Sequence, residues 1–148
     1  MMSRNLVVVA MPVVLWLAAV VVSADAARGT SEQTTTNDRV YTKAQADGAK
    51  AQFMKICADC HPFTAAAKKK PKDVPLGDEA FFDNWDGRSL QELITTIALT
   101  MPNDGSAVVS EKEAANLTAY ILQQNGFQAG SKPLTKETAS AIVARPKK

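Results

Sequence analysis

The stretch Cys57-Ala58-Asp59-Cys60-His61 constrains this chain more than any other, because it holds both cysteines and the one histidine of the sequence. The spacing Cys-x-x-Cys-His is typical of covalent attachment of a c-type haem. Each thiol adds to one vinyl group of the porphyrin, and the adjacent imidazole supplies an axial nitrogen to the iron. The motif therefore predicts one covalently bound haem c, attached at Cys57 and Cys60 and ligated by His61.

Other sites also use a Cys-x-x-Cys pair, namely thioredoxin-like redox centres, zinc sites and disulfides. A redox pair normally opens a helix that follows a strand, but no strand pattern precedes Ala44. A tetrahedral zinc ion needs four ligands, for which two cysteines and one histidine are too few. A redox pair or a disulfide remains as the alternative to haem attachment.

The amino terminus carries the pattern of a secretory signal. Arg4 precedes an apolar run over residues 6–22, and an Ala-x-Ala cleavage site ends at Ala26. We therefore predict a signal peptide over residues 1–26 and export to the periplasm, which agrees with haem attachment to reduced thiols outside an energised membrane. The run of 17 residues also reaches the lower limit for a membrane span, so an uncleaved anchor over residues 6–22 remains the alternative.

Three stretches combine a capping pattern with apolar residues at helical spacing. Each begins with Thr or Ser, followed three residues later by Gln or Glu. The pairs are Thr42 with Gln45, Ser89 with Glu92, and Ser110 with Glu113. The first helix is predicted over residues 43–57 and ends at the thiols, the second stops before Pro102, and the third stops at Asn125-Gly126. No β-alternation of useful length is present, so the predicted fold is all-α.

These helices suggest the domain plan. A small all-α domain of three to four helices is predicted to wrap around one haem over residues 41–127. The polar stretch 27–40 lacks periodicity and is predicted to be a flexible leader. Residues 128–148 contain at most a marginal helix and are predicted to be a flexible tail. Within the domain, three aromatic residues are expected to wall the haem crevice: Phe81, Phe82 and Trp85.

The sixth ligand of the iron is predicted to be Met101. A thioether sulfur stabilises ferrous iron and raises the reduction potential. A second imidazole is excluded within this chain, because His61 is its one histidine. Beyond the signal segment the sequence retains Met54 and Met101, and Met54 lies too close to Cys57 to reach the opposite ring face. Pro102 also forces extended geometry on Met101. A lysine ligand or an open site remains the alternative.

The net charge of +2, which loss of residues 1–26 leaves unchanged, is too small to indicate a nucleic-acid partner. Positive charge is concentrated in the run 68–72, Lys-Lys-Lys-Pro-Lys, which follows the haem attachment point. Such a run is typical of an ordinary solvated loop. The functional alternative is a docking patch that steers an acidic redox partner toward the haem edge.

These features resemble those of the class I, or mitochondrial-type, c-type cytochromes over about residues 41–127. In this resemblance Cys57 and Cys60 correspond to the thioether cysteines, and His61 and Met101 correspond to the two axial ligands. The early motif followed by a Met-Pro pair distinguishes this class from four-helix-bundle cytochromes, whose motif lies near the carboxyl end. The resemblance implies the small cytochrome c fold, with its helices around one haem, and an electron carrier that binds no substrate.

Two further positions of the family are matched and two are altered. Phe53 resembles the aromatic residue of the first helix, and Tyr120 resembles the aromatic residue of the terminal helix that crosses it. Ala49 stands where the family usually has glycine, with Gly48 as its neighbour. Val74 occupies the place of the proline that helps to orient the histidine, which leaves open the carbonyl that accepts the Nδ1 proton.

The segment from Phe81 to Pro102, together with Asn125-Gly126-Phe127, is also similar to single-haem domains found beside or fused to bacterial quinoprotein dehydrogenases. This resemblance implies a partner that oxidises alcohols or sugars. We therefore expect an exported carrier of single electrons between a dehydrogenase donor and an oxidase or cytochrome acceptor, not an enzyme by itself. The alternatives are a fixed electron-transfer subunit of a periplasmic dehydrogenase or oxidase complex, and a haem sensor or peroxidase that opens its sixth site.

Overall fold

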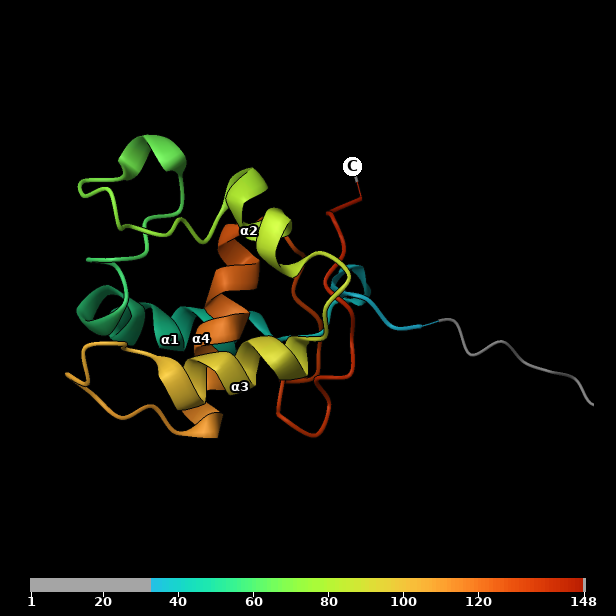
Figure 1. Ribbon diagram of the computed structural model, residues 1–148. Helices are drawn as coiled ribbons and strands as arrows, with labels where there is room; N and C mark the ends of the chain where they lie inside the picture. Colours follow the sequence, from blue (N-terminus) through green and yellow to red (C-terminus); the bar gives the residue numbers. More distant parts are fainter. Residues whose placement is uncertain (1–32, 148) are drawn as a thin grey trace, which may run out of the picture. The chain divides into compact units, whose positions relative to one another are not determined.

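Four α-helices and two 3₁₀ turns form the regular structure of residues 33–147, which are the residues that the computed structural model describes (Figure 1). In chain order the elements are η1 (Thr36–Asp38), α1 (Lys43–Ile56), η2 (Ala65–Ala67), α2 (Asp78–Trp85), α3 (Leu90–Thr100) and α4 (Glu111–Gln124). Isolated β-bridges join distant segments, but this part of the chain contains no strand. The predicted all-α fold is therefore confirmed.

The predictions about the amino terminus concern residues outside this range. The signal segment 1–26 and the first part of the leader, residues 27–32, lie outside the described residues. Among the helices that the structure does describe, none has the length and apolar character needed to cross a bilayer. Export and anchoring stay predictions.

The predicted capping boxes are confirmed at α3 and α4. Ser89 and Ser110 each accept a hydrogen bond from the N–H three residues on, and the glutamate there accepts the serine N–H in return. At α1, Thr42 caps the N–H of Gln45, but the Gln45 side chain bonds the N–H and the carbonyl of Leu134, at 2.8 and 2.6 Å. A full capping box at α1 also requires the Gln45 side chain to accept the Thr42 N–H. This part of the prediction is wrong, because the Gln45 side chain bonds the carboxyl-terminal segment instead.

The start of α2 is not marked by a capping pattern. Its N-cap is Gly77, which offers no side-chain capping bond. A Cβ at Gly77 would lie 2.1 Å from the Phe63 carbonyl oxygen, so this close approach of two backbone segments requires glycine. The three aromatic side chains predicted to form a wall are all buried on α2: Phe81, Phe82 and Trp85.

Helix α4 packs against both α1 and α3 (Figure 1). The rings of Phe53 on α1 and Tyr120 on α4 lie 5.1 Å apart, and Phe63 stacks on Phe53 at 5.0 Å. The aromatic pair implied by the resemblance is thus present, with a third ring added. Ala49 is buried, whereas Gly48 faces open space, so the alanine is the residue that α1 contributes to the core.

The prediction of a flexible tail over residues 128–148 is wrong for the part that the structure describes. Its apolar side chains are buried in the core: Leu134, Ala139, Ala141 and Val143. The Leu90 N–H donates to the Ala141 carbonyl at 2.9 Å, and the Val143 N–H donates to the Arg88 carbonyl at 2.8 Å. Helix propensity in this segment is low, but tertiary burial and backbone bonds hold it against the start of α3.

The leader predicted over residues 27–40 is also ordered in its second half. Thr36 is buried, its hydroxyl donates to the Ala144 carbonyl at 3.0 Å, and its N–H donates to the Ile142 carbonyl at 2.9 Å. The two ends of the described chain therefore run side by side. The prediction of flexibility is wrong for residues 34–39, because the carboxyl-terminal segment provides hydrogen-bond partners for them.

Candidate haem site

The Cys-x-x-Cys-His motif forms the turn that ends α1. The Cys57 N–H donates to the Phe53 carbonyl at 2.9 Å, and the N–H groups of Cys60 and His61 both donate to the Cys57 carbonyl, at 3.1 and 2.9 Å. α1 thus ends at the first cysteine, and the tight turn brings the second thiol and the imidazole to the same region. Both cysteines are free in the structure.

Burial distinguishes the two thiols, because Cys57 is half-buried and Cys60 is exposed. Loss of solvation raises the pKa of the Cys57 thiol to about 11, so this group is protonated at neutral pH. A redox-active Cys-x-x-Cys pair instead contains a cysteine of lowered pKa. A redox pair also normally opens a helix, whereas here Cys57 is the C-cap of α1, and this position is the observation that disfavours a thioredoxin-like pair.

The His61 ring is oriented by a backbone carbonyl. Its Nδ1 lies 2.9 Å from the carbonyl oxygen of Val74. A carbonyl oxygen only accepts hydrogen bonds, so Nδ1 carries the proton and Nε2 keeps its lone pair for a metal. The carbonyl that the sequence left open is thus that of Val74, the residue at the family's proline position.

Met101 follows the last residue of α3 and has an extended backbone, with φ −120° and ψ 143°. This is the geometry predicted from Pro102. Met101 lines the same cleft as the two cysteines and the histidine. Met54 is 58% exposed and does not line this cleft. The structure thus brings all four predicted site residues together, although their roles as haem ligands stay predictions.

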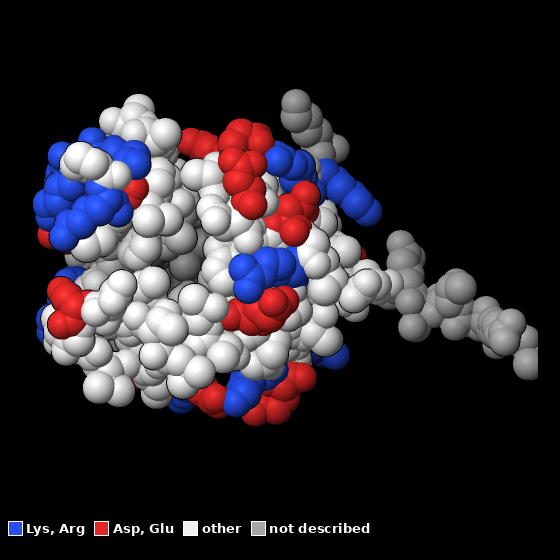
Figure 2. All heavy atoms as spheres, in the orientation of Figure 1, with Lys and Arg blue, Asp and Glu red and all other residues white. Residues whose placement is uncertain are grey.

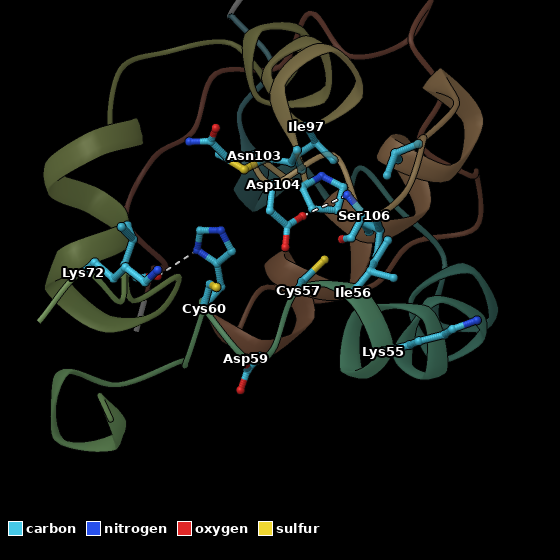
Figure 3. Close-up of a pocket in the computed structure, with 16 residues that line it drawn as sticks. Lys55, Ile56, Cys57, Asp59, Cys60, Lys72, Ile97, Asn103, Asp104 and Ser106 are labelled. Atoms are coloured by element: carbon cyan, nitrogen blue, oxygen red, sulfur yellow. Dashed lines mark hydrogen bonds between the residues drawn. The ribbon is translucent and has the colours of Figure 1, made fainter. Parts of the chain in front are cut away.

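The cleft has a volume of about 590 Å³ and lies between the cysteine turn and the loop that follows α3. Figure 3 shows Cys57 and Cys60 on one side of it and Asn103 and Asp104 on the other. An apolar cavity of about 70 Å³ shares several lining residues with the cleft. Its walls include Leu76, Trp85, Leu93, Ile97, Leu117 and Ile121.

These residues fit a haem. Two thiols, one imidazole and one thioether are the donor set of a covalently bound haem with nitrogen and sulfur ligands. The volume of the cleft lies within the range of cofactor sites, roughly 300–1,000 Å³. The apolar walls suit the macrocycle, while the outer rim carries charged side chains: Lys55, Asp59, Lys72 and Asp104.

The loop that carries the lysine run 68–72 is held in shape by two aspartates. The buried Asp73 carboxylate accepts the N–H groups of Lys69 and Lys70 at 2.8 and 2.9 Å, and these hydrogen bonds lower its pKa. The Lys70 ammonium pairs with Asp59 in the cysteine turn at 3.1 Å. Figure 2 shows the positive side chains gathered over this loop. The loop is therefore both strongly cationic and tied to the cysteine turn.

Two residues near the site carry no sequence pattern that marks their role. Phe63 joins the aromatic contact between Phe53 on α1 and Tyr120 on α4. The sequence indicates this role only through the position of Phe63, two residues after the histidine. Asn125 is predicted only as a helix stop, yet its Nδ2 donates to the Leu76 carbonyl at 2.8 Å. No local pattern reveals this bond, because it joins residues 49 positions apart.

An all-α fold in which a Cys-x-x-Cys-His turn and a methionine border one apolar cleft defines a c-type cytochrome domain. Residues 44–121 match the family described as cytochrome c oxidase, cbb3-type, subunit III, and the chain belongs to this family. Searches among curated proteins and among solved structures found no match. The protein is thus an electron-transfer haem protein whose haem is covalently bound. Class I membership and the association with quinoprotein dehydrogenases stay predictions.

Proposed function

We propose that this protein is an exported carrier of single electrons that binds one haem c at Cys57 and Cys60, with His61 and Met101 as axial ligands. The observation that carries the proposal is the meeting of these four side chains at one apolar cleft. When bound, the haem supplies a one-electron couple between ferric and ferrous iron. The family match supports a covalent haem and electron transfer, and the cleft supports the ligand pair.

The chain's own residues provide the conditions for this role. His61 is oriented through the bond from its Nδ1 to the Val74 carbonyl, which leaves Nε2 available. Met101 stands at the end of α3, whose Ile97 carbonyl accepts its N–H at 3.2 Å. The apolar walls of the cleft limit access of water, which favours the less charged ferrous centre and raises the reduction potential.

A visible spectrum of the purified protein in both redox states, with mass spectrometry of the same sample, tests the proposal. We expect a low-spin c-type spectrum, the mass of one haem on the polypeptide, the long-wavelength ferric band typical of sulfur ligation, and an amino terminus just after Ala26. A colourless protein from a host with working cytochrome c maturation would refute the haem site. A haem protein that lacks the sulfur band would refute the role of Met101 alone.

The lysine run 68–72 supports a redox partner with an acidic surface. The four lysines are exposed. The ion pair between Lys70 and Asp59 keeps the loop beside the cysteine turn, so a partner bound to these lysines would lie close to the haem site. Complementary charge increases the rate of encounter and orients the partners, while adding little to net affinity.

A fixed subunit of a periplasmic oxidase or dehydrogenase complex is the second candidate function. The description of the matching family names an oxidase subunit, and this observation favours the candidate. Purification from the native host in mild conditions distinguishes the two functions. A free monomer supports the shuttle, whereas constant copurification with a larger enzyme supports the fixed subunit.

A further inference from the structure

The carbonyl that orients His61 lies on a segment that pairs with the residues around the imidazole. The Val74 N–H donates to the Cys60 carbonyl at 3.0 Å, and the Leu76 N–H donates to the Pro62 carbonyl at 2.8 Å. These two bonds have the register of parallel strands, in which evenly spaced bonds alternate in direction between the two segments. The bond between them would run from an N–H at residue 62 to the Val74 carbonyl.

Residue 62, however, is a proline and has no N–H to donate. The Val74 carbonyl therefore lacks its backbone donor, and Nδ1 of His61 takes this place at 2.9 Å. Any other residue at position 62 would bring an N–H directed at the same oxygen, so the imidazole would share this acceptor with a backbone donor. Pro62 thus leaves the Val74 carbonyl available to the imidazole.

A side chain from the end of α4 fixes the other end of the segment. Nδ2 of Asn125 donates to the Leu76 carbonyl at 2.8 Å and to the Ile121 carbonyl of its own helix at 2.9 Å. Oδ1 of Asn125 is buried and has no hydrogen-bond partner in the structure, so the amide group makes its bonds here as a donor. Gly77, the next residue of the segment, is pressed against the Phe63 carbonyl. The segment 74–76 therefore has little freedom to shift.

We propose that Pro62 and Asn125 are positioning residues for His61. Pro62 keeps the Val74 carbonyl free for Nδ1, and Asn125 holds the segment that presents this carbonyl. The inference rests on the proposed function of His61 as an iron ligand. A firm hydrogen bond from Nδ1–H makes the imidazole a stronger donor, which stabilises ferric iron and lowers the reduction potential. Weakening this bond at either residue therefore raises the potential.

The variants Pro62→Ala and Asn125→Leu test the proposal in the full-length, haem-loaded protein. The first introduces the backbone N–H directed at the Val74 carbonyl, and the second removes the anchor of the segment. For each variant we expect the equilibrium constant for reduction to increase roughly threefold, because both residues act one step removed from the ligand. We also expect the His61 Nδ1 proton to exchange faster with solvent and to move upfield in the NMR spectrum of the reduced protein.

Matched controls separate this role from general structural effects. Pro133→Ala removes an exposed proline that does not line the haem cleft. Asn84→Leu removes an asparagine near the end of α2 whose Nδ2 donates to the Ala80 carbonyl four residues earlier, at 2.8 Å. Asn125 has the same bond to its own helix, and its bond to Leu76 is the feature that Asn84 lacks. Neither control should change the potential or the Nδ1 proton.

The outcomes are distinct. A wild-type protein without a low-spin haem would refute the proposed function and this inference with it. A wild-type protein with that haem, whose potential and Nδ1 proton stay unchanged in both variants, would overturn the inference alone. A change in only one variant would show that the residue altered in the other variant does not position His61. If Asn125→Leu does not fold, Pro62→Ala decides the result by itself.

Discussion

The two sides of the haem cleft are built differently. On the histidine side, the cysteine turn is bonded to segment 74–76 through two backbone hydrogen bonds and through Nδ1 of His61. Asn125, the C-cap of α4, and the ion pair between Lys70 and Asp59 tie this side to its surroundings. The histidine is therefore held by contacts between segments far apart in the sequence.

On the methionine side, the loop 102–108 is mostly exposed, and its hydrogen bonds are local. The Gly105 N–H donates to the Pro102 carbonyl, and the Ser106 N–H donates to the Asp104 carboxylate, both at 3.0 Å. Val108 is 93% exposed. Met101, the proposed sulfur ligand, therefore stands between a well-packed helix and a loop with few anchoring contacts.

The difference indicates which of the two proposed ligands is preorganised. Regions with few buried contacts and an exposed backbone open at lower free energy than regions joined by long-range bonds. Met101 should therefore leave the iron before His61 does, under mild denaturant or in competition with an added ligand. We therefore expect the side that carries the two cysteines to stay in place.

Removal of each proposed ligand in turn should give the largest effects. His61→Ala is expected to prevent a stable low-spin protein. Met101→Ala should keep the covalent haem, lose the sulfur band and lower the equilibrium constant for reduction on the order of a hundredfold or more. Visible spectroscopy and potentiometry measure both. Met54→Ala is the matched control, because that methionine is exposed and outside the cleft. Loss of attached haem in Met101→Ala would contradict the comparison.

Local sequence patterns picked out the four candidate residues that the structure brings to one cleft, because these residues are marked by their immediate neighbours. The two cysteines and His61 form one motif, and Met101 is marked by Pro102. Helix starts are equally local, since a capping pair spans four residues, and two of the three predicted boxes are present in full. The burial of Phe81, Phe82 and Trp85 on α2 was also predictable, because large aromatic side chains usually line the core of a small domain.

Interactions between distant segments could not be predicted in this way. Gln45 bonds Leu134 across 89 residues, and Thr36 bonds Ala144 across 108. The carboxyl-terminal segment lacks helical or strand periodicity, so its burial depends on a surface formed by other helices. The hydrogen bond between His61 and the Val74 carbonyl is another interaction that local patterns could not predict. The resemblance placed Val74 at the family's proline position, but it left open which carbonyl accepts the Nδ1 proton.

The carboxyl-terminal segment should stabilise the domain without favouring either side of the cleft. Leu134 is 1% exposed, and Leu134→Ala should reduce the free energy of unfolding by roughly 2–5 kcal/mol. Leu99→Ala is the control, because Leu99 is 78% exposed and its truncation leaves no cavity. Denaturant unfolding measures the loss, and the sulfur band should be unchanged in the folded protein. Loss of this band in folded Leu134→Ala would show that the segment supports the methionine side.

Charge changes on the two sides should have smaller, salt-dependent effects. Lys69→Gln removes one positive charge from the histidine side, and Val108→Glu adds one negative charge to the methionine side, so the net charge changes equally. If the acidic partner docks on the lysine loop, Lys69→Gln slows electron transfer about twofold to threefold at low ionic strength, and the effect disappears at high salt. Stopped-flow mixing with an acidic redox protein measures the rates. A larger loss in Val108→Glu would place docking on the methionine side.

Protonation of Asp73 in acid should weaken its hydrogen bonds to the lysine loop on the histidine side. We expect this effect to be the smallest of those predicted. Hydrogen bonds from the N–H groups of Lys69 and Lys70 lower the pKa of this carboxylate below its value in the unfolded chain. A group whose pKa is lower in the folded state contributes stability above its unfolded pKa, and this stability is lost as the pH falls through the folded pKa. The protection factors of the Lys69 and Lys70 amides should therefore decrease over this acidic range, as measured by hydrogen exchange.

The variant Asp73→Asn isolates this effect, because a neutral amide oxygen still accepts hydrogen bonds but does not titrate there. Protection of the same two amides should be weaker at neutral pH and independent of pH below it. Asp104→Asn is the counterpart on the methionine side, where Ser106 lowers the pKa of an exposed carboxylate. This second variant should leave the lysine loop unchanged. Since Asp73 is buried and Asp104 is exposed, an equal response of the loop to both variants would mean that acid acts through overall charge rather than through the anchor at Asp73.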